Sequence, residues 1–368
     1  MTEVVILGGG FAGVSAAKTL LKRTDRSKVL ITLIDKNSYH LFTSSLYEVA
    51  ASEEPQKNVC IPLSEILKGA EVVKGEIQKI DKEKKEVQLK DYTLNYDYLI
   101  IALGSEPEYR EIPGLEQYSI TFKTLEDAVK IRDLIREKLK EKDLVQVLIG
   151  GGGASGCELS SELVHHIKKG LKISLIQKSP QLVKELNIEA AKVAYKRLLD
   201  RDVEICFGER ITKVFEDHLE TDRNDIHNFD LLVWAGGIKG NSVCGNLKVN
   251  EDLQVQGSEN VFAAGDIAFL NENIPQTVRV AKEQGKIVGL NIVHKLKGEH
   301  LEKYKFKNDI FIVPLVGKYA VVQLNSFLIK GFLGWAIQQF VFLKYLLNIL
   351  PVNRALKRWN RFEEYLIK

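Results

Sequence analysis

The sequence lacks the features that mark several common protein classes. Its four cysteines have neither C-x-x-C spacing nor the density of a disulfide framework, so we expect reduced thiols in an intracellular protein. They are Cys60, Cys157, Cys206 and Cys244. The seven histidines show no metal-ligand spacing, which argues against a metal site. The chain begins with a strand-like apolar run rather than with a secretory signal.

Long apolar runs and a uniform charge excess are also missing. No stretch of about 18 uncharged apolar residues occurs, so we expect no membrane-spanning helix. The net charge of +3 is unevenly placed, because residues 326–368 contain seven Lys or Arg and two Glu, giving +5 there and −2 in the rest. This local basic excess predicts an anionic partner, either phospholipid or nucleic acid. With 368 residues, 45% of them hydrophobic, the chain is long enough for two or three globular domains.

The order strand, glycine turn, helix, strand occurs twice. In the first copy an apolar run reaches a turn at residues 8–13, a helical stretch follows, and a second apolar run ends at Asp35. In the second copy the turn lies at residues 151–156 and the closing strand ends at Gln177. The last glycine of the turn precedes the strand end by 22 positions in the first copy and by 21 in the second. Each copy therefore predicts the βαβ unit of a Rossmann fold.

The glycine positions of both turns suit the diphosphate of a dinucleotide. The first glycine permits a tight turn, the second lets backbone N–H groups approach the diphosphate, and the third lets the helix pack on the strand. The diphosphate then lies at the N-terminus of the helix. A mononucleotide P-loop is disfavoured because neither turn continues with Gly-Lys-Ser/Thr. The expected cofactor-binding glycines are Gly8, Gly10 and Gly13 in the first turn and Gly151, Gly153 and Gly156 in the second.

Three further segments resemble those of two-dinucleotide flavoproteins. Residues 96–105 are similar to the segment that leads from the FAD domain to the nicotinamide domain, and residues 230–237 to the segment that leads back. Residues 261–267 resemble the flavin fingerprint, in which an aspartate contacts the ribityl chain. The resemblance implies FAD on the first turn and a nicotinamide cofactor on the second. The cofactor-binding residues that it adds are Gly104, Gly236 and Asp266.

Within that superfamily the chain most resembles type II NADH dehydrogenases, the single-subunit NADH:quinone oxidoreductases. Residues 37–50 are similar to the segment after the first acidic residue, with Ser44 and Ser45 where a proline-containing pair is usual. Residues 275–285 follow the flavin fingerprint as the quinone-proximal helix does, and residues 331–368 resemble the membrane-associating helices. The resemblance implies a quinone acceptor and no metal or iron–sulfur centre.

The quinone-proximal segment departs from the family pattern at two positions. Arg279 and Glu283 replace the two usual glutamines, and their spacing of four residues allows an ion pair on one helix face. This departure concerns the acceptor and not the flavin. The expected quinone-proximal residues are Pro275, Gln276, Thr277, Arg279 and Glu283.

Two acidic side chains have expected roles. Asp35 should accept the ribose hydroxyls of the FAD adenosine, with Lys36 beside it as a further cofactor contact; alternatively Asp35 only caps a turn. By resemblance, Glu158 approaches the nicotinamide and the flavin and is the candidate catalytic residue. Its alternative role is that of a first-turn glutamate that complements the helix dipole. Glu162, one turn further on, is expected to be structural.

The strand-end residue of the second copy bears on the choice of donor. Gln177 stands where an acidic residue would favour NADH, so the repulsion of a 2′-phosphate is missing and NADPH becomes an alternative donor. Lys178 or Ser179 meets that phosphate if the loop turns inward. In the alternative arrangement Lys178 points into solvent and NADH is preferred.

The C-terminal segment combines apolar and basic faces. Around residues 330–348 the polar side chains fall within about 120° on a helical wheel, and Pro351 ends that helix. The polar positions are Lys330, Gly334, Gln338, Lys344 and Asn348, and only Gln339 breaks the pattern. The next helix carries an apolar stripe of Val352, Ala355, Leu356, Trp359, Phe362 and Leu366 opposite Arg354, Lys357, Arg358 and Arg361. Such faces suit an interfacial helix that binds anionic phospholipid, or else packing on the protein's own core or a second subunit in a homodimer.

Together these patterns predict an α/β fold with two Rossmann-like dinucleotide-binding domains and a C-terminal amphipathic helical segment for membrane association. Residues 1–113 and 240–309 should form the FAD domain, 114–239 the NAD(P)H domain and 310–368 the membrane region. The expected reaction passes hydride from NAD(P)H to FAD and then electrons to a membrane quinone, without proton pumping. The protein would act as a peripheral enzyme at the cytoplasmic face of the cell membrane.

Three other functions share some of these sequence features. A sulfide:quinone oxidoreductase shares the fold but requires a working cysteine pair near the flavin and commonly a third cysteine in the C-terminal half, whereas no cysteine follows Cys244. A flavoprotein reductase with a non-quinone acceptor has the same donor chemistry. A nucleotide-dependent signalling or DNA-binding protein would use the basic C-terminus, but its interleaved apolar stripe suits lipid better than a phosphate groove, so no nucleic acid partner is expected.

Overall fold

The computed structural model describes residues 1–52, 56–270, 274–307, 310–315 and 317–367, without the side chains of residues 56–57 and 361–367. The chain divides into two units. The first unit comprises Met1–Phe42, Cys60–Glu106 and Ile238–Lys307, and the second comprises Thr43–Val59, Pro107–Gly237 and Asn308–Lys368. Each unit contains one of the two glycine turns.

The first unit is built on a five-stranded parallel sheet in the order β21-β9-β1-β2-β5. Its strands are β1 Thr2–Leu7, β2 Val29–Asp35, β5 Glu71–Lys74, β9 Tyr98–Ile101 and β21 Val261–Ala263. A three-stranded antiparallel sheet accompanies it, consisting of β6 Ile77–Asp81, β7 Glu86–Leu89 and β8 Thr93–Asn95. The shorter strands are β3 Tyr39–Leu41, β4 Cys60–Pro62, β10 Ser105–Pro107, β19 Ile238–Gly240, β20 Leu247–Lys248 and β22 Ala268–Phe269, and the helices are α1 Phe11–Arg23, α4 Leu63–Ile66 and α9 Val278–Lys297.

The second unit repeats this plan with a parallel sheet in the order β11-β18-β12-β13-β14 and an antiparallel sheet β15-β16-β17. The parallel strands are β11 Ser119–Thr121, β12 Val145–Gly150, β13 Leu171–Gln177, β14 Val203–Phe207 and β18 Leu231–Trp234. The antiparallel strands are β15 Ile211–Val214, β16 His218–Thr221 and β17 Ile226–Asn228. Its helical segments, apart from the C-terminal ones, are η1 Thr43–Ser45, α2 Leu46–Ala51, α3 Gln56–Val59, α5 Leu115–Tyr118, α6 Leu125–Glu141, α7 Ala154–His166 and α8 Ile188–Leu199.

These two sheets confirm the predicted fold class of two Rossmann-like domains. The glycine turns start where β1 and β12 end, and the strands that close the two βαβ units, β2 and β13, end at the predicted residues Asp35 and Gln177. Because parallel strands end at a common edge, each turn lies beside the carboxyl ends of its neighbours. In an open α/β sheet this edge is where ligands bind.

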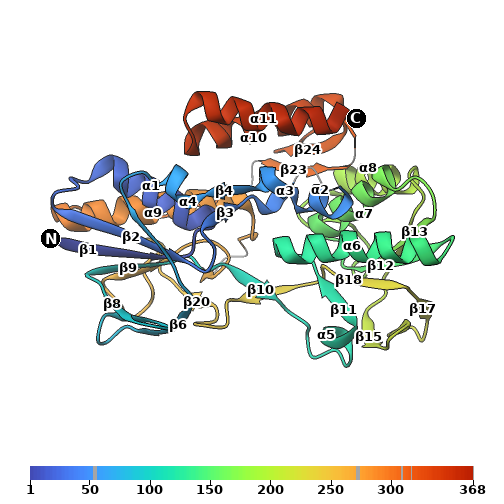
Figure 1. Cartoon of the computed structure of the whole chain (residues 1–368), viewed down its shortest axis with the longest axis horizontal. Helices are drawn as coiled ribbons and strands as arrows, with labels where there is room; N and C mark the ends of the chain where they lie inside the picture. The colour runs from blue at the N-terminus through green and yellow to red at the C-terminus, as the bar shows by residue number, and fades with distance from the viewer. Residues whose placement is uncertain (53–55, 271–273, 308–309, 316, 368) are drawn as a thin grey trace. The chain divides into compact units, whose positions relative to one another are not determined.

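Two helices of the first unit, α1 and α9, pack closely because glycine occupies the contact. A Cβ on Gly285 would lie 2.1 Å from the carbonyl oxygen of Ala12, and one on Gly289 would lie 2.8 Å from that of Ala16. Figure 1 shows the two helices side by side. This contact holds the start of α1, and with it the first glycine turn, against the segment after residues 261–267.

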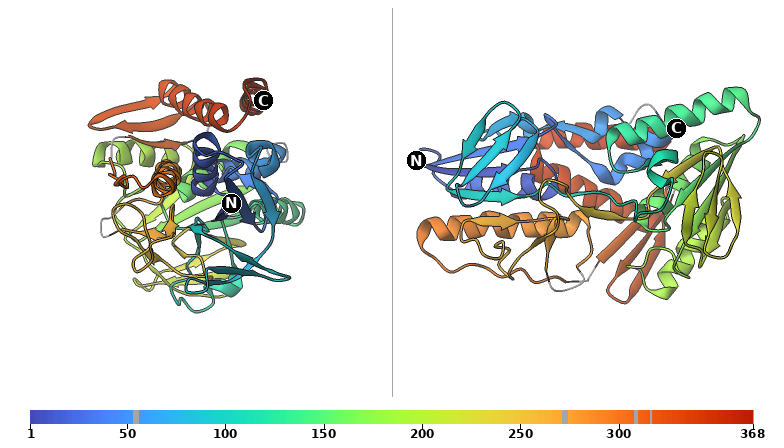
Figure 2. Two further views of the ribbon diagram at one scale, coloured as in Figure 1. Left: turned by 90° about the vertical axis from the view of Figure 1, so that its left-hand side faces the viewer. Right: turned by 90° about the horizontal axis from the view of Figure 1, so that it is seen from below.

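The C-terminal part of the second unit is a three-stranded antiparallel sheet that leads into two helices, α10 and α11. Its elements are β23 Ile310–Pro314, β24 Ala320–Leu324, β25 Phe327–Gly331, α10 Phe332–Ile349 and α11 Val352–Ile367. The left view of Figure 2 shows the last strand running directly into α10. Helix α10 packs on this sheet, and a Cβ on Gly334 would lie 2.3 Å from the carbonyl oxygen of Ala320.

The packing of α10 corrects the predicted polar face. Gly334 belongs to the buried face, because it is the point of closest approach to β24, and Gln339 is buried beside it. Large apolar side chains remain exposed on the opposite side: Phe332, Leu333, Phe340, Val341 and Leu347. By length and composition alone, α10 also meets the criterion for a membrane span, with a mean hydropathy of 1.2, although it contains Lys344.

The second predicted amphipathic stripe is described in part. On α11, Ala355 is buried, whereas Val352 and Leu356 are exposed. Arg358 donates a hydrogen bond from Nη1 to the carbonyl oxygen of Asn58. The structure does not describe the side chains of the other predicted positions Arg361, Phe362 and Leu366.

Candidate dinucleotide sites

The first glycine turn has the close contacts that its sequence predicts. Gly8 has φ of 104°, and a Cβ there would lie 2.3 Å from the carbonyl oxygen of Ala102. A Cβ on Gly13 would lie 1.9 Å from the carbonyl oxygen of Gly8. A Cβ on Gly10, by contrast, would meet nothing within 4 Å. Gly8 and Gly13 are therefore required by the backbone itself, whereas Gly10 keeps an open face at the N-terminus of α1, where a diphosphate fits.

Asp35 organises the same turn through both carboxylate oxygens. Oδ2 accepts a hydrogen bond from the backbone N–H of Gly9 at 2.6 Å, and Oδ1 accepts one from Asn37 at 2.7 Å. Burial raises the pKa of Asp35, and these two hydrogen bonds partly oppose the rise. The turn-capping role and the ribose-binding role are therefore compatible, since each oxygen keeps a second lone pair. Lys36 is exposed beside it.

His40 supports this turn and was not predicted from the sequence. Its ring is completely buried, with Nδ1 2.9 Å from the carbonyl oxygen of Gly9, and it packs edge-on against Phe11. Burial lowers the pKa of His40 to about 4, so the ring is neutral at physiological pH. A single buried hydrogen bond of this kind follows no spacing rule, so the sequence contains no pattern that would indicate His40.

The flavin-fingerprint segment is held by three polar side chains of the first unit. The Ser105 hydroxyl donates to Oδ2 of Asp266 at 2.6 Å. The buried amide oxygen of Gln284 accepts the backbone N–H of Gly265 at 2.8 Å, and Gln276 donates to the backbone oxygen of Asp266 at 3.0 Å. Gly104, next to Ser105, has φ of 69° and open space where a Cβ would lie. Ser105 and Gln284 are further residues that the sequence analysis missed.

The second glycine turn repeats the geometry of the first. Gly151 has φ of 115°, and a Cβ there would lie 2.7 Å from Cα of Gly236. A Cβ on Gly156 would lie 2.0 Å from the carbonyl oxygen of Gly151, whereas one on Gly153 would meet nothing within 4 Å. The second unit therefore offers the same open glycine face at the N-terminus of α7.

Gln177 takes the place of Asp35 in this second turn. Its Oε1 accepts the backbone N–H of Gly152 at 2.9 Å, and its Nε2 donates to the carbonyl oxygen of Gln181 at 3.1 Å. The side chain thus performs the turn-capping part of the aspartate's role without its negative charge.

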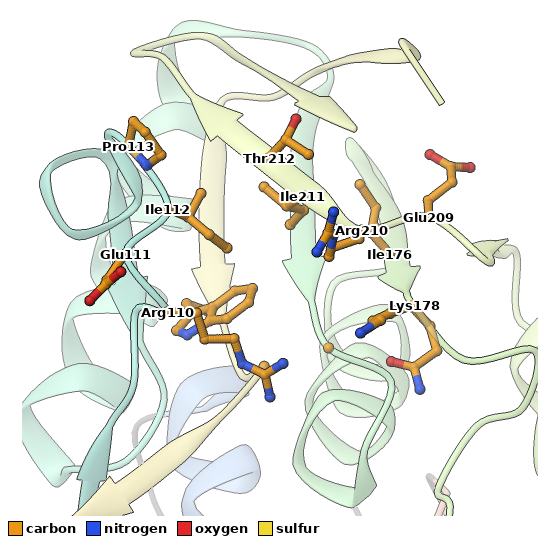
Figure 3. Close-up of a pocket in the computed structure, with 14 residues that line it drawn as sticks. Arg110, Glu111, Ile112, Pro113, Ile176, Lys178, Glu209, Arg210, Ile211 and Thr212 are labelled. Atoms are coloured by element: carbon orange, nitrogen blue, oxygen red, sulfur yellow. The ribbon is translucent and has the colours of Figure 1, made fainter. Parts of the chain in front are cut away.

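A cavity of about 370 Å³ opens beside Gln177 in the second unit. Gly151, Gly236 and Trp234 are among the residues that line it. Three basic side chains, Arg110, Lys178 and Arg210, line it as well. Figure 3 shows Lys178 and Arg210 extending toward Arg110 from the opposite wall. Lys178 was a candidate here from the sequence, whereas the two arginines were not, because they lie in loops far from the glycine motif.

Glu158 lies in a group of acidic side chains on α7 and α2. Burial raises the pKa of Glu158 to about 8. Burial also raises the pKa of Glu48 well above its usual range, and the charge of the nearby Glu162 adds to that rise. Oε1 of Glu162 lies 3.0 Å from Nε2 of His166, which agrees with the structural role expected for it. Because α7 begins at Ala154, Glu158 lies beyond the first helical turn, and this weakens the helix-dipole explanation of its presence.

The predicted quinone-proximal segment spans the approach to α9 and its first turns. The expected ion pair is present, with Nη1 of Arg279 3.8 Å from Oε1 of Glu283. Tyr304 donates a hydrogen bond to Oε2 of Glu283 at 3.3 Å, and Arg279 also bonds the backbone oxygen of Lys307. Thr277 caps α9 by accepting the N–H of Val280. Pro275 and Gln276 directly precede this cap.

One side-chain group in the described part of the chain has the composition of a metal site. Ligand atoms of Cys206, Glu209 and His227 lie within 4.8 Å of one another. Oε2 of Glu209 is already 2.7 Å from Nε2 of His227, so a hydrogen bond accounts for two of the three residues. The cysteines Cys157, Cys206 and Cys244 form no disulfide.

The comparison with protein families decides the classification. The family model described as pyridine nucleotide-disulphide oxidoreductase matches residues 2–285, which is most of the chain. The chain belongs to the pyridine nucleotide-disulphide oxidoreductase family. The matched residues include both glycine turns. The family confirms the expectation of a flavoprotein that uses a nicotinamide cofactor.

Within the pyridine nucleotide-disulphide oxidoreductase family, the chain is similar to type II enzymes. It is 28% identical over 342 residues to the type II NADH:quinone oxidoreductase of Staphylococcus aureus, covering 83% of this chain and 85% of that protein. The predicted resemblance is thereby confirmed.

Two solved structures share the fold. The NDH2 of Plasmodium falciparum, solved in complex with NADH, superposes with a TM-score of 0.87 at 18% identity, covering 100% of this chain and 98% of that one. The sulfide:quinone oxidoreductase of Aquifex aeolicus superposes with a TM-score of 0.81 at 19% identity, covering 98% of this chain and 92% of that one.

Proposed function

We propose that the protein is an FAD-dependent NADH:quinone oxidoreductase. The observation that carries this proposal is the pair of dinucleotide turns. In each turn a side chain on the first or third glycine would clash with backbone, whereas the second glycine has open space beside it. The similarity to a type II NADH:quinone oxidoreductase over most of both chains supports the same activity. FAD, when bound, supplies the chemistry that accepts hydride and releases electrons, and the protein supplies position and electrostatics.

In this proposal Asp35, Glu158 and the residues of the two turns each have a role. Asp35 orients the adenosine ribose of FAD, and its hydrogen bond from the backbone N–H of Gly9 keeps the carboxylate at the turn that it caps. Glu158 holds a proton near neutral pH because its pKa is raised to about 8, so it can donate a proton during the reaction with the acceptor. Gly8, Gly10, Gly13, Lys36, Gly104 and Asp266 contact FAD; Gly151, Gly153, Gly156, Gln177 and Gly236 contact the nicotinamide cofactor.

In this proposal the FAD domain comprises residues 1–113 and 240–309, the nicotinamide domain residues 114–239, and the membrane-associating region residues 310–368. Thr43–Val59 and residues 107–113 lie in the second unit, so they accompany the nicotinamide turn rather than the FAD turn. Pro275, Gln276, Thr277, Arg279 and Glu283 lie near the quinone. Arg279 and Glu283 compensate each other's charge, which suits an uncharged quinone beside them.

The C-terminal helices provide the membrane contact in this proposal. The exposed apolar side chains of α10 adjoin basic residues such as Lys330 and Lys344, and the segment 326–368 carries +5. This combination favours binding to anionic phospholipid at the cytoplasmic face of the cell membrane. A homodimer that covers the same face is the alternative.

Sulfide:quinone oxidation is the second candidate function, because one superposed structure is such an enzyme. Cys157, however, is fully buried, and burial and the neighbouring Glu158 raise the pKa of its thiol, so it does not provide a reactive thiolate. A quinone analogue tests both functions. Reduction that depends on NADH supports the proposal, and reduction that depends on sulfide without NADH oxidation selects the alternative.

A further inference from the structure

The cavity beside Gln177 holds more positive charge than the ribose of NADH requires. Arg110 comes from the loop before α5, Lys178 from the end of β13, and Arg210 from the loop between β14 and β15. Three separate segments of the second unit therefore bring a cation to one cavity of about 370 Å³. In Figure 3 the charged ends of Lys178 and Arg210 point from one wall toward the side on which Arg110 lies.

The acidic residues of the same cavity do not cancel these cations. Oε2 of Glu209 lies 2.7 Å from Nε2 of His227, and in Figure 3 its carboxylate points away from Lys178 and Arg210. Glu111 is directed outward on the other side of the cavity in the same view. Outside the cavity lining, Oδ2 of Asp222 lies 3.6 Å from Nε of Arg210, and its Oδ1 accepts the backbone N–H of Arg210. The Arg210 side chain is 59% exposed, and the four N–H groups of its two terminal nitrogens are left for a further anion.

Gln177 places no negative charge beside the cavity. A carboxylate at this strand end would repel a phosphate on the 2′-oxygen of the adenosine ribose. In this chain the position is neutral, and its two polar groups already bond Gly152 and Gln181. The loop that follows is held by these bonds, which fixes the position from which Lys178 leaves the strand.

We infer that this cavity binds the 2′-phosphate of NADPH, with Lys178 and Arg210 as its main charged ligands and Arg110 on the opposite side. The inference rests on the proposed function, which places a nicotinamide cofactor on the second turn, and extends it to the phosphorylated donor. Arg and Lys form charge-assisted hydrogen bonds with phosphate oxygens, and a phosphate dianion gains from several of them at once. NADPH is thus a donor that this protein accepts, in addition to NADH.

Binding of two fragments tests the inference without any turnover. Adenosine 2′,5′-bisphosphate carries the 2′-phosphate, and adenosine 5′-monophosphate lacks it. Isothermal titration of the full FAD-loaded protein should show at least about tenfold tighter binding of the bisphosphate at low salt. The preference should shrink as ionic strength rises, because exposed charge contacts are screened. Equal affinities for the two fragments would overturn the inference.

Variants then locate the phosphate. Lys178→Gln with Arg210→Gln should reduce the preference to less than about twofold, with the affinity for the monophosphate almost unchanged. Lys178→Arg should retain most of the preference, since the charge is kept. Lys213→Gln is the matched control: it removes one positive charge from neighbouring β15 but not from the cavity lining. If the preference survives the double variant, or falls equally in the control, the phosphate does not bind at this site.

The single variants Lys178→Gln and Arg210→Gln provide the same readout if the double variant does not fold. The result is independent of the acceptor, because no quinone is present. If the bisphosphate binds as expected but neither NADH nor NADPH reduces the flavin, the proposed function fails while the phosphate site stands. If NADH reduces the flavin but the fragments bind equally, only the phosphate site is wrong.

Discussion

The amide oxygen of Gln177 accepts the backbone N–H of Gly152 at 2.9 Å. In the first unit, Oδ2 of Asp35 accepts the N–H of Gly9 at 2.6 Å in the same position of the turn. One architectural contact is thus made by a neutral side chain in one copy and by a carboxylate in the other. The difference leaves the turn intact and changes the charge that a bound ribose meets.

Replacing Gln177 with Glu should restore that charge. The glutamate can still accept the N–H of Gly152, so the turn itself should survive, but it cannot donate to the carbonyl oxygen of Gln181, so the loop after the strand loses one bond. We expect the ratio of kcat/KM for NADH to that for NADPH to rise by about tenfold or more, mainly because NADPH becomes a poorer substrate. Steady-state rates with both donors and one quinone analogue measure this. An unchanged ratio would show that residue 177 does not face the ribose.

The two open glycines offer a reciprocal test of the two turns. Gly10→Val should fold, because a Cβ there meets nothing within 4 Å, but it should lose FAD because the side chain fills the space of the diphosphate. Gly153→Val should also fold, retain FAD and lose NADH binding. Flavin absorbance per protein and NADH titration distinguish the two. A Gly10→Val protein that copurifies with full flavin would show that the first turn is wrongly assigned.

Gly13 provides the structural control for that pair. A Cβ at Gly13 would lie 1.9 Å from the carbonyl oxygen of Gly8, so Gly13→Val must displace backbone. We expect a markedly lower melting temperature for Gly13→Val than for Gly10→Val. Similar melting temperatures would mean that the contrast between required and open glycines is not real.

Protonation of Glu158 should make stability depend on pH in a defined direction. The folded-state pKa is about 8, above the ordinary value of 4.5, so the folded protein retains this proton after the unfolded chain has released it. The resulting stability is fully present below about pH 4.5 and is lost as the pH rises toward 8. Glu158→Gln has no proton to release at this position, so its stability does not fall with pH for this reason. Its melting temperature relative to the unaltered protein should therefore rise between pH 5 and pH 9, and a constant difference would contradict the raised pKa.

A role for Glu158 in the reaction makes a separate prediction. If its proton is transferred, the rate of quinone reduction should fall as the pH rises above about 8, and Glu158→Gln should remove that pH dependence and lower kcat. Glu162→Gln serves as the comparison, because Glu162 is paired with His166. Loss of the alkaline limb in both variants would argue against a specific role for Glu158.

The exposed face of α10 should carry membrane binding. Leu333 and Phe340 are 67% and 65% exposed, so Leu333→Asp with Phe340→Asp should leave the fold intact. Burial of each side chain in lipid is worth about 1.5–3 kcal/mol, so binding to anionic vesicles should fall by roughly a hundredfold or more. Ile226→Asp, on the exposed edge of β17, is the control. Cosedimentation with vesicles gives the result, and undiminished binding by the double variant would exclude this face.

Deletion of residues 326–368 is a less informative test than these substitutions. Helix α10 packs on β24 through Gly334, so its removal uncovers part of the core of the second unit. We expect the truncated protein to lose stability together with membrane binding. A truncated protein that stayed folded and still bound anionic vesicles equally well would contradict the assignment of this segment.

Local patterns in the sequence predicted the two Rossmann copies, because strand ends, glycine turns and the distance from Gly13 to Asp35 are set by contacts between near neighbours in the chain. The ion pair between Arg279 and Glu283 followed from helical spacing in the same way. The polarity of its residues did not predict the buried face of α10. Gly334 is buried because it has no side chain and lets the helix approach β24 closely, not because it is apolar.

Residues that reach a site from distant loops escaped the sequence analysis. Arg110 and Arg210 line the cavity next to Gln177 although they lie 67 positions before it and 33 after it. His40 and Gln284 support their turns through single buried hydrogen bonds that no motif describes. Such contacts depend on how separate segments meet in the fold, and one sequence does not contain that information in any local pattern.

The central claim is that bound FAD passes electrons from a nicotinamide donor to a quinone. An anaerobic absorbance spectrum of the purified protein tests it most directly, recorded first alone, then after one equivalent of NADH, and then after a quinone analogue. We predict a flavin spectrum at the start, bleaching of that band by NADH, and its full return when the quinone is added. A colourless protein, or a flavin that NADH leaves oxidised, would contradict the account; a flavin that NADH bleaches and the quinone fails to restore would contradict the assignment of the acceptor.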